Sequence, residues 1–472
     1  MSTRFARTRI ACAVAALALG ACTTPVQAGG FQLNESSASG LGTAFAGGAA
    51  AAEDASTLWG NVAGLSRIHK GQGIAVLHLI KPSMEFGNVS SVAAAQQSLG
   101  HEGGDAGGMN YVPNLYYAAP INAQWSAGIG ITAPWGLVTE YDNGWMGRFQ
   151  AIRSSIETIN VNPGVSWKPA SNFALGFGLN YQRIDAEFTN QVNYSGALLS
   201  AAATAGIAPG SPTYLAIAQA TPGLESSAKI KGDADAWGWN AGLLWNISPE
   251  HRVGLHYRSN IKYDISGSAQ FVHPTPSVPP PLAGLVGQLA AGVNAKAYDG
   301  GVTSKVEIPA IVNLSFFSAV SPQVDLMIDA QWTGWSTIKD LTFVRSDGKD
   351  AGSVLQSTPE NFEDAWKIAV GANYRLGGGW LLRGGLAYDQ SPVQMAFRTP
   401  RLPDNDKTWV TAGGQYRFAN GLTLDFGAAY IWVADGTISS DPSAQSKAAY
   451  GLLSGRYSGN SVILSGQLSM EF

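Results

Sequence analysis

The residues that most often carry catalysis or bind metal ions are sparse and scattered in this sequence. The six histidines show no metal-ligand spacing, and both cysteines, Cys12 and Cys22, fall in the first 28 residues. We recognise no serine, histidine and aspartate pattern typical of hydrolases. The sequence therefore predicts a protein that is not an enzyme and that uses neither a cofactor nor a metal ion.

The chemistry that remains is the pairing of basic side chains with anionic groups. Lysines and arginines recur at alternate positions of extended segments, where they share one face. A buried anion needs a cation or several donors, because an unpaired buried charge is costly. We expect most of these cations to pair with nearby aspartates and glutamates. Some of these cations are expected, from their odd or even positions, to point inward near one end of their segments. We rank these first for binding an external anion: Arg258, Lys262, Lys305 and Lys367.

The segments that must position these side chains follow an export signal. Arg4, Arg7 and Arg9 precede an apolar run from Ile10 to Gly20, and Val26-Gln27-Ala28 supplies a small-residue cleavage site. We therefore expect residues 1–28 to be a signal peptide. The Leu19-Gly20-Ala21-Cys22 stretch also fits a lipoprotein signal, so lipidation of Cys22 stays open as the alternative.

Alternation of apolar and polar residues predicts an all-β fold. In the last segment Val462, Leu464, Leu468 and Phe472 share one face, opposite serines and glutamine, and aromatic residues gather at segment ends. Such alternation over about ten residues is typical of transmembrane barrel strands. We expect fourteen antiparallel strands, near 71–80, 110–119, 124–134, 148–168, 172–190, 227–247, 251–268, 302–319, 322–342, 362–376, 379–389, 406–418, 421–434 and 459–472.

The connections between these segments favour a membrane barrel over a β-sandwich, which also alternates. Tiny turns such as Gly377-Gly378 and Asn420-Gly421 follow the even-numbered segments, and longer loops follow the odd-numbered ones. Outer-membrane barrels have short periplasmic turns and long external loops. The sequence predicts a barrel over residues 67–472 in the outer membrane of a Gram-negative-type cell, in contact with membrane lipid and lipopolysaccharide, as a monomer that binds no nucleic acid.

Two long loops, 191–226 and 270–301, are unusually apolar and look partly helical. External loops normally face water, so exposed apolar patches often mark a binding site. The alternative is that these residues only pack the loops against each other. The candidates for capturing a hydrophobic molecule are Leu198, Leu199, Ile207, Tyr214, Leu215, Ile217, Leu282, Leu285, Val286 and Leu289.

Residues 29–66 show no barrel alternation and are rich in glycine and alanine. A segment of this size could fill the barrel lumen as a plug, or hatch. The hatch residues that we single out are Gly30, Phe31, Asn34, Glu35, Glu53, Asp54, Asn61, Val62 and Ala63.

These same residues resemble the mature N-terminus of the FadL family of long-chain fatty acid transporters. The stretches Gly30–Glu35, Ser39–Gly42 and Ala52–Ala55 match it, and later fragments such as Trp237–Gly242 and Phe362–Ala369 follow in the family's order. The resemblance covers essentially the whole chain after residue 28. It implies a fourteen-stranded barrel with an N-terminal hatch that imports long-chain fatty acids by passive diffusion.

The resemblance also implies a route. Substrate is captured on the external loops, passes to an internal hydrophobic pocket, and leaves sideways through an inward kink of the third strand, for which Pro134, Trp135 and Gly136 are the candidates. Related proteins import aromatic or aliphatic hydrocarbons, which need no cation for a head group. A general porin or a structural barrel is the remaining alternative. Where the family hatch often has Asn-Pro-Ala, this chain has Asn61-Val62-Ala63, which puts the hatch geometry there in doubt.

Overall fold

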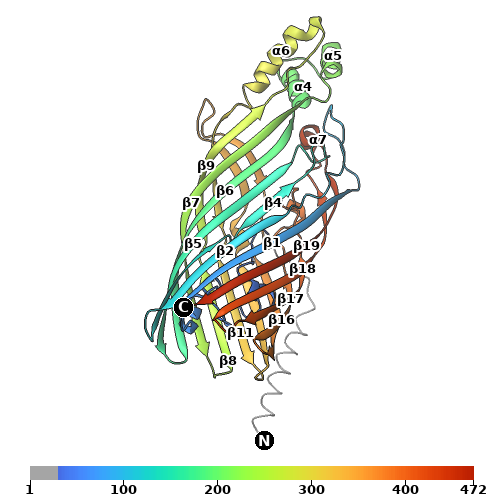
Figure 1. Cartoon of the computed structure of the whole chain (residues 1–472). Coiled ribbons are helices and arrows are strands. Elements are labelled where there is room, and N and C mark those ends of the chain that lie inside the picture. The colour runs from blue at the N-terminus through green and yellow to red at the C-terminus, as the bar shows by residue number, and fades with distance from the viewer. Residues whose placement is uncertain (1–29) are drawn as a thin grey trace.

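The computed structural model describes residues 30–472, which form one closed antiparallel β-barrel around an N-terminal hatch (Figure 1). The expected signal peptide and Cys22 lie outside the described residues. No helix among those described is both long and apolar enough to cross a membrane. The strands are β1 (Gln72–Asn88), β2 (Asn110–Pro120), β3 (Trp125–Thr132), β4 (Gly136–Glu140), β5 (Arg153–Ala170), β6 (Phe173–Asn193), β7 (Glu225–Asn246), β8 (His251–Arg258), β9 (Ile261–Val272), β10 (Gly300–Ile308), β11 (Ile311–Ala319), β12 (Val324–Thr333), β13 (Asp340–Arg345), β14 (Val354–Pro359), β15 (Ala365–Gly377), β16 (Trp380–Asp389), β17 (Lys407–Arg417), β18 (Leu422–Ser439) and β19 (Ser454–Glu471).

The barrel closes where β1 pairs with β2 on one edge and with β19 on the other. The β1–β19 ladder runs from the Gln72↔Glu471 pair to the Asn88↔Gly455 pair. Several barrel strands are interrupted: β3 with β4, β8 with β9, β11 with β10, β12 with β13, and β15 with β14 each form one barrel strand. The wall therefore has fourteen antiparallel barrel strands, which confirms the prediction from alternation.

Burial along the strands is the reverse of that in a soluble protein. On β19, Leu464 and Leu468 are about half exposed, whereas Ser465 and Gln467 are buried in the lumen. Apolar residues thus face lipid and polar residues face inward. Aromatic pairs border this apolar band, with Trp125 stacked on Trp167 beside the short turns at a centroid distance of 5.9 Å.

The wall extends well beyond the membrane on the side of the long loops. Strands β6 and β7 have 21 and 22 residues, about twice the 9–11 that cross a bilayer. Above the exposed aromatic residues Tyr181 and Trp237, the outer face becomes charged, as in the Arg183–Asp233 pair at 2.9 Å. The upper half of the barrel therefore stands in the polar layer outside the hydrocarbon.

Helices from the two long loops cap this upper end (Figure 1). The helices are α4 (Tyr194–Thr204), α5 (Pro212–Ala220) and α6 (Pro280–Asn294), with the shorter α7 (Ala444–Tyr450) beside them. Leu198, Ile217 and Val286 meet in one apolar cluster between α4, α5 and α6. The two loops are thus held together by a small core of their own.

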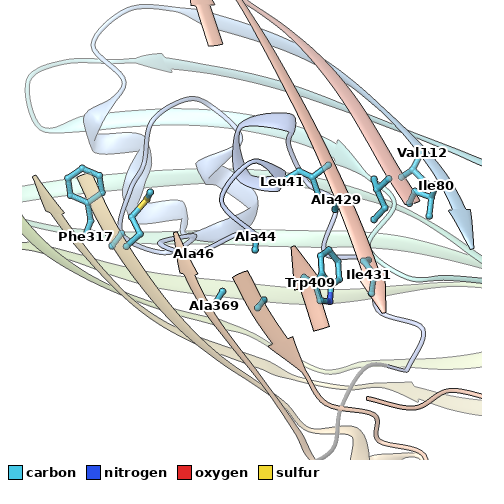
Figure 2. Close-up of a cluster of buried hydrophobic side chains, with 14 residues drawn as sticks. Leu41, Ala44, Ala46, Ile80, Val112, Phe317, Ala369, Trp409, Ala429 and Ile431 are labelled. Atoms are coloured by element: carbon cyan, nitrogen blue, oxygen red, sulfur yellow. The ribbon is translucent and has the colours of Figure 1, made fainter. Parts of the chain in front are cut away.

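The hatch fills the lower lumen with short elements, α2 (Ala38–Leu41), α3 (Thr57–Gly60) and the 3₁₀ helix η1 (Val62–Arg67). Figure 2 shows Leu41, Ala44 and Ala46 of the hatch among Phe317, Trp409 and other side chains of the wall. Two wall glycines permit this contact. A Cβ atom at Gly254 would stand 1.8 Å from the carbonyl oxygen of Ala49, and one at Gly385 would stand 2.2 Å from the carbonyl carbon of Thr43.

Buried polar contacts fix the hatch to the wall. The Arg383 guanidinium lies between Glu53 of the hatch at 2.9 Å and Asp425 of β18 at 2.7 Å. Asn61 donates to the carbonyl oxygens of Ala49 at 2.7 Å and of Leu243 at 2.9 Å. Removing a buried cation that two carboxylates share is strongly destabilising, because the carboxylates are then left with uncompensated charge.

We predict that Arg383→Ala lowers the free energy of unfolding by about 3–5 kcal/mol. Urea unfolding in lipid vesicles, followed by tryptophan fluorescence, measures the change. The matched control is Arg417→Ala, which breaks the Arg417–Glu471 pair near the short turns, where the arginine side chain is 56% exposed. That variant should lose less than about 1 kcal/mol. Equal losses in the two variants would contradict a special role for the buried network.

Candidate functional site

The upper lumen contains a cavity of about 930 Å³. We call it the upper cavity. Its lining is mainly apolar and comes from the inner faces of β6, β7, β9, β10 and β13 and from the connections between strands. The principal apolar residues are Ile184, Phe188, Ile230, Tyr263, Ile265, Val302, Ile338, Phe343, Phe362 and Leu402. Such a volume and lining suit an apolar molecule of moderate size.

A second cavity, of about 660 Å³, lies beside the interruption of the third barrel strand. We call it the lateral cavity. Trp409 and Ile431 line it from the lumen, whereas Tyr111, Ile131 and Ile159 line it from the outer face, where they are 68%, 43% and 58% exposed. The cavity therefore reaches from the lumen to the lipid-facing side of the wall.

The interruption itself is held by the hatch. β3 ends at Thr132 and β4 begins at Gly136, so Ala133, Pro134 and Trp135 leave the ladder. The hatch takes the place of a strand there: the Leu33 amide donates to the Pro134 carbonyl at 2.9 Å, and the Gly136 amide donates to the Phe31 carbonyl at 3.0 Å. Proline cannot donate to a neighbouring strand, which is consistent with a break at this position.

Phe31 separates the two cavities. Its ring, with Leu137, Ile156 and Leu402, belongs to the lining of both. It packs edge-on against Trp335 at 4.9 Å and Trp135 at 5.9 Å. The two cavities are therefore adjacent, with the Phe31 side chain between them.

Among the described basic residues that line the upper cavity, Arg401 is buried, whereas Lys231, Lys262, Lys305 and Lys339 are exposed. Arg401 lies between β16 and β17, is 5% exposed, and donates to Ser154 Oγ at 3.2 Å and Asn190 Oδ1 at 3.3 Å. Within residues 30–472 it forms no salt bridge. A buried guanidinium with neutral partners retains the capacity to bind an anion.

The carboxyl group of Glu360, between β14 and β15, lines the same cavity. Burial raises the pKa of Glu360 to about 8, so near neutral pH this group is mostly uncharged. Burial lowers the pKa of Arg401 to about 10, which leaves the guanidinium charged. Near neutral pH the buried part of this lining therefore carries the charge of Arg401 beside an uncharged Glu360.

Two of the four predicted cations face the lumen but lie below the upper cavity. Arg258 stacks on the ring of Trp59 in the hatch at 3.6 Å and donates to the Trp59 carbonyl at 3.2 Å. Lys367 lies between the rings of Phe45 and Trp409, at 5.0 Å and 4.5 Å. Both contact the hatch together with the wall.

The inward orientation expected for Lys262 and Lys305 is wrong. Their side chains are 75% and 90% exposed on the outer face. Alternation reverses across the two-residue interruptions Ser259-Asn260 and Pro309-Ala310, so the even positions that point inward on β8 point outward on β9. A shift of one residue moves a side chain to the other face of a strand. The inward direction predicted from alternation on one side of these interruptions therefore does not hold on the other side.

The predicted capture residues lie in the external helices, except Ile207, which lies between α4 and α5. Leu198, Leu199, Ile217, Val286 and Leu289 are buried among α4, α5 and α6, and Ile207, Tyr214, Leu282 and Leu285 are partly buried around them. Leu215 is 49% exposed. The structure brings nine of the ten residues together, without Leu215, and packing of the loops against each other accounts for the five that are buried.

The predicted hatch residues fall into two groups. Those that meet the lateral cavity are Gly30, Phe31, Asn34 and Glu35. Those that anchor the hatch lower down are Glu53, Asp54, Asn61, Val62 and Ala63, of which Asp54 accepts from Gln467 Nε2 at 2.8 Å. Val62 is the first residue of η1, a position that proline tolerates well, so valine there keeps a geometry that the family's proline would also fit.

Sequence reasoning missed Arg401, Glu360, Trp335 and Phe362. All four lie in connections or strand interruptions, where alternation gives no information about direction. Phe362 begins a fragment that resembles the family, and Arg401, between Pro400 and Leu402, carries no pattern of its own.

The whole chain is similar to known outer-membrane proteins. The family model of the outer membrane protein transport protein (OMPP1/FadL/TodX) matches residues 19–472. The long-chain fatty acid transport protein of Escherichia coli O6:H1 is 31% identical over 431 residues, which cover 91% of each chain. Outer membrane protein P1 of Haemophilus influenzae is 28% identical and covers 86% of each chain.

Solved structures share the fold. A Pseudomonas aeruginosa FadL homologue has a TM-score of 0.81 and 24% identity, covering 94% of this chain and 100% of its own. The P. putida toluene transporter TodX has a TM-score of 0.66 and 16% identity, covering 95% and 99%. With the barrel, the lumenal hatch and the apolar cavities, these matches show that the chain belongs to the OMPP1/FadL/TodX family of outer-membrane proteins that transport hydrophobic substrates.

Proposed function

We propose that this protein takes up long-chain fatty acids by passive diffusion. The observation that carries the proposal is Arg401, a buried cation with neutral partners in an apolar cavity. Burial of an acyl chain in such a lining contributes about 0.8 kcal/mol of hydrophobic free energy for each methylene. Its carboxylate requires a charged or donating partner, which Arg401 provides.

The route has three stages. The external helices capture the apolar chain, the upper cavity holds it with the carboxylate at Arg401, and displacement of Phe31 admits it to the lateral cavity. From there the break in the third barrel strand leads to the lipid around the barrel. No step needs an energy source, since the gradient and the hydrophobic effect drive the movement.

A hydrocarbon importer is the second candidate, because most of the lining is apolar and the P. putida toluene transporter has the same fold. A hydrocarbon would leave the Arg401 guanidinium desolvated and without an anionic partner, which disfavours it. Growth of a host that lacks its own transporter separates the two. Growth on oleate supports the proposal, and growth on an alkane or toluene but not on oleate would overturn it.

Replacing the cation should weaken the binding of anions selectively. We predict that Arg401→Leu raises the KM for oleate uptake by about tenfold, equivalent to the loss of one charge-assisted hydrogen bond. Oleyl alcohol, which has the same chain but no charge, serves as the matched ligand and should bind with little change. Equal losses for both ligands would show that the substitution only disturbs the fold.

The affinity for fatty acids should fall as the pH rises. Below about pH 8 Glu360 is protonated and leaves Arg401 to the ligand. Above it the ionised Glu360 neutralises Arg401 and repels the carboxylate. We predict weaker binding of a fluorescent fatty acid at pH 9 than at pH 7, measured by fluorescence titration.

Glu360→Gln is the control for this titration. It keeps the size and polarity of the side chain but cannot ionise, so binding should become nearly independent of pH over the same range. The same pH dependence in both proteins would rule out Glu360 as its source.

A further inference from the structure

The barrel wall has a second discontinuity, between β10 and β13. The ladder between these strands comprises two residue pairs, Val302↔Arg345 and Thr303↔Val344. On its other edge β10 pairs with β9 over its whole length, from Gly300 to Ile308. Among the described residues, Ser304–Ile308 therefore have no ladder partner toward β13, nor does the facing edge of β13. We call this opening the β10–β13 gap.

The gap results from the path of the chain between β12 and β13. After Thr333 the chain leaves the ladder through the 3₁₀ helix η2 (Trp335–Thr337) and rejoins it only near the top of β13. Below, the wall is closed again where Ile311 pairs with Thr333. The five residues without a ladder partner span about 16 Å of strand at about 3.3 Å each. Thr337 Oγ1 of η2 donates to the Glu307 carbonyl at 3.4 Å near the lower end of this span.

The upper cavity continues through this gap. Its lining includes the inward Ser304 and Phe343, and also the outward Lys305, Glu307 and Lys339 on the two edges. The Ser304 hydroxyl is buried, and within residues 30–472 it has no hydrogen-bond partner. A buried hydroxyl without a partner on an unpaired strand edge is a site that a polar group passing through the gap could occupy.

Charged side chains of both signs surround the outer mouth, the basic Lys262, Lys305 and Lys339 and the acidic Asp264, Glu307 and Asp340. Lys262 and Lys305 are mostly exposed, and their contacts with Glu307 at 3.4 Å and Asp264 at 3.7 Å are loose surface pairs. Such pairs contribute little free energy, so an anion can replace the acidic partner at small cost. Lys339 stands exposed on the opposite edge.

The height of the mouth along the barrel suits the binding of an amphipathic ligand. Below it, neighbouring strands carry the lipid-facing Leu314 and Trp366, which are 51% and 46% exposed. The mouth itself is charged and therefore lies at the height of the lipid head groups. An amphiphile in the outer leaflet would present its head group to the lysines, with its chain close to the apolar cavity behind them.

We propose that the β10–β13 gap is a side entrance for fatty acids that lie in the outer leaflet. Lys262, Lys305 and Lys339 bind the carboxylate at the mouth, and the acyl chain passes the unpaired strand edges into the upper cavity. The gap lies between the eighth and ninth barrel strands, whereas the lateral cavity lies beside the break in the third. The entrance and the lateral cavity therefore open on different sides of the wall. This proposal rests on the proposed function and adds a binding site to it.

Blocking the mouth tests the entrance. The described chain contains no cysteine, so Lys305→Cys introduces a single site for a polyethylene-glycol maleimide. Uptake of radiolabelled oleate should fall at least fivefold after labelling of this variant. Lys229→Cys is the matched control: it lies on the outer face of β7, nearer the external helices, and labelling it should leave uptake unchanged. Full uptake by labelled Lys305→Cys, or an equal fall in both variants, would overturn the entrance.

The same assay keeps the two proposals apart. If the unlabelled parent takes up no oleate, the proposed function fails; if it does but labelling at position 305 has no effect, only the side entrance fails. A triple variant, Lys262→Gln with Lys305→Gln and Lys339→Gln, should raise the KM for oleate several-fold with an unchanged maximal rate and leave oleyl alcohol unaffected. A change in maximal rate alone would speak against head-group binding at the mouth.

Discussion

The constraint on which this structure depends is that every backbone group at membrane depth must find a hydrogen-bond partner inside the protein. The closed ladder meets it over most of the wall, with β1 joined to both β2 and β19. Where the ladder breaks at Pro134, residues 31–33 of the hatch supply the missing partners. The hatch is thus part of the wall at the point where the wall opens, so any movement of the hatch there also changes the opening.

Buried charge is used in two different ways. Arg383 is enclosed by Glu53 and Asp425 and joins hatch to wall, so its charge is satisfied within the protein. Arg401 has only neutral partners and faces an apolar cavity, with a protonated Glu360 in the same lining. The first arrangement serves stability, and the second leaves a charge available for a ligand.

The stabilising contacts and the cavities lie at different heights along the barrel. The lower lumen is packed with small hatch residues against wall glycines, which leaves little free space. The cavities begin above this level, and the interruptions of the eighth and ninth barrel strands lie above the lipid-facing band. An open strand edge is tolerated there because water and head groups can satisfy it, which they cannot do in the hydrocarbon.

The sequence alone determined the barrel, the strand number and the hatch, because lipid on one side and a polar lumen on the other impose strict alternation on every strand, and the residues around Phe31 and Glu53 resemble the family. Only the tertiary structure decided which cations reach the lumen. Short interruptions at Ser259-Asn260 and Pro309-Ala310 reverse the alternation and turn Lys262 and Lys305 outward. Arg401 and Glu360 meet in the upper cavity because loops distant in sequence fold into the lumen, where no periodic pattern constrains the direction of a side chain.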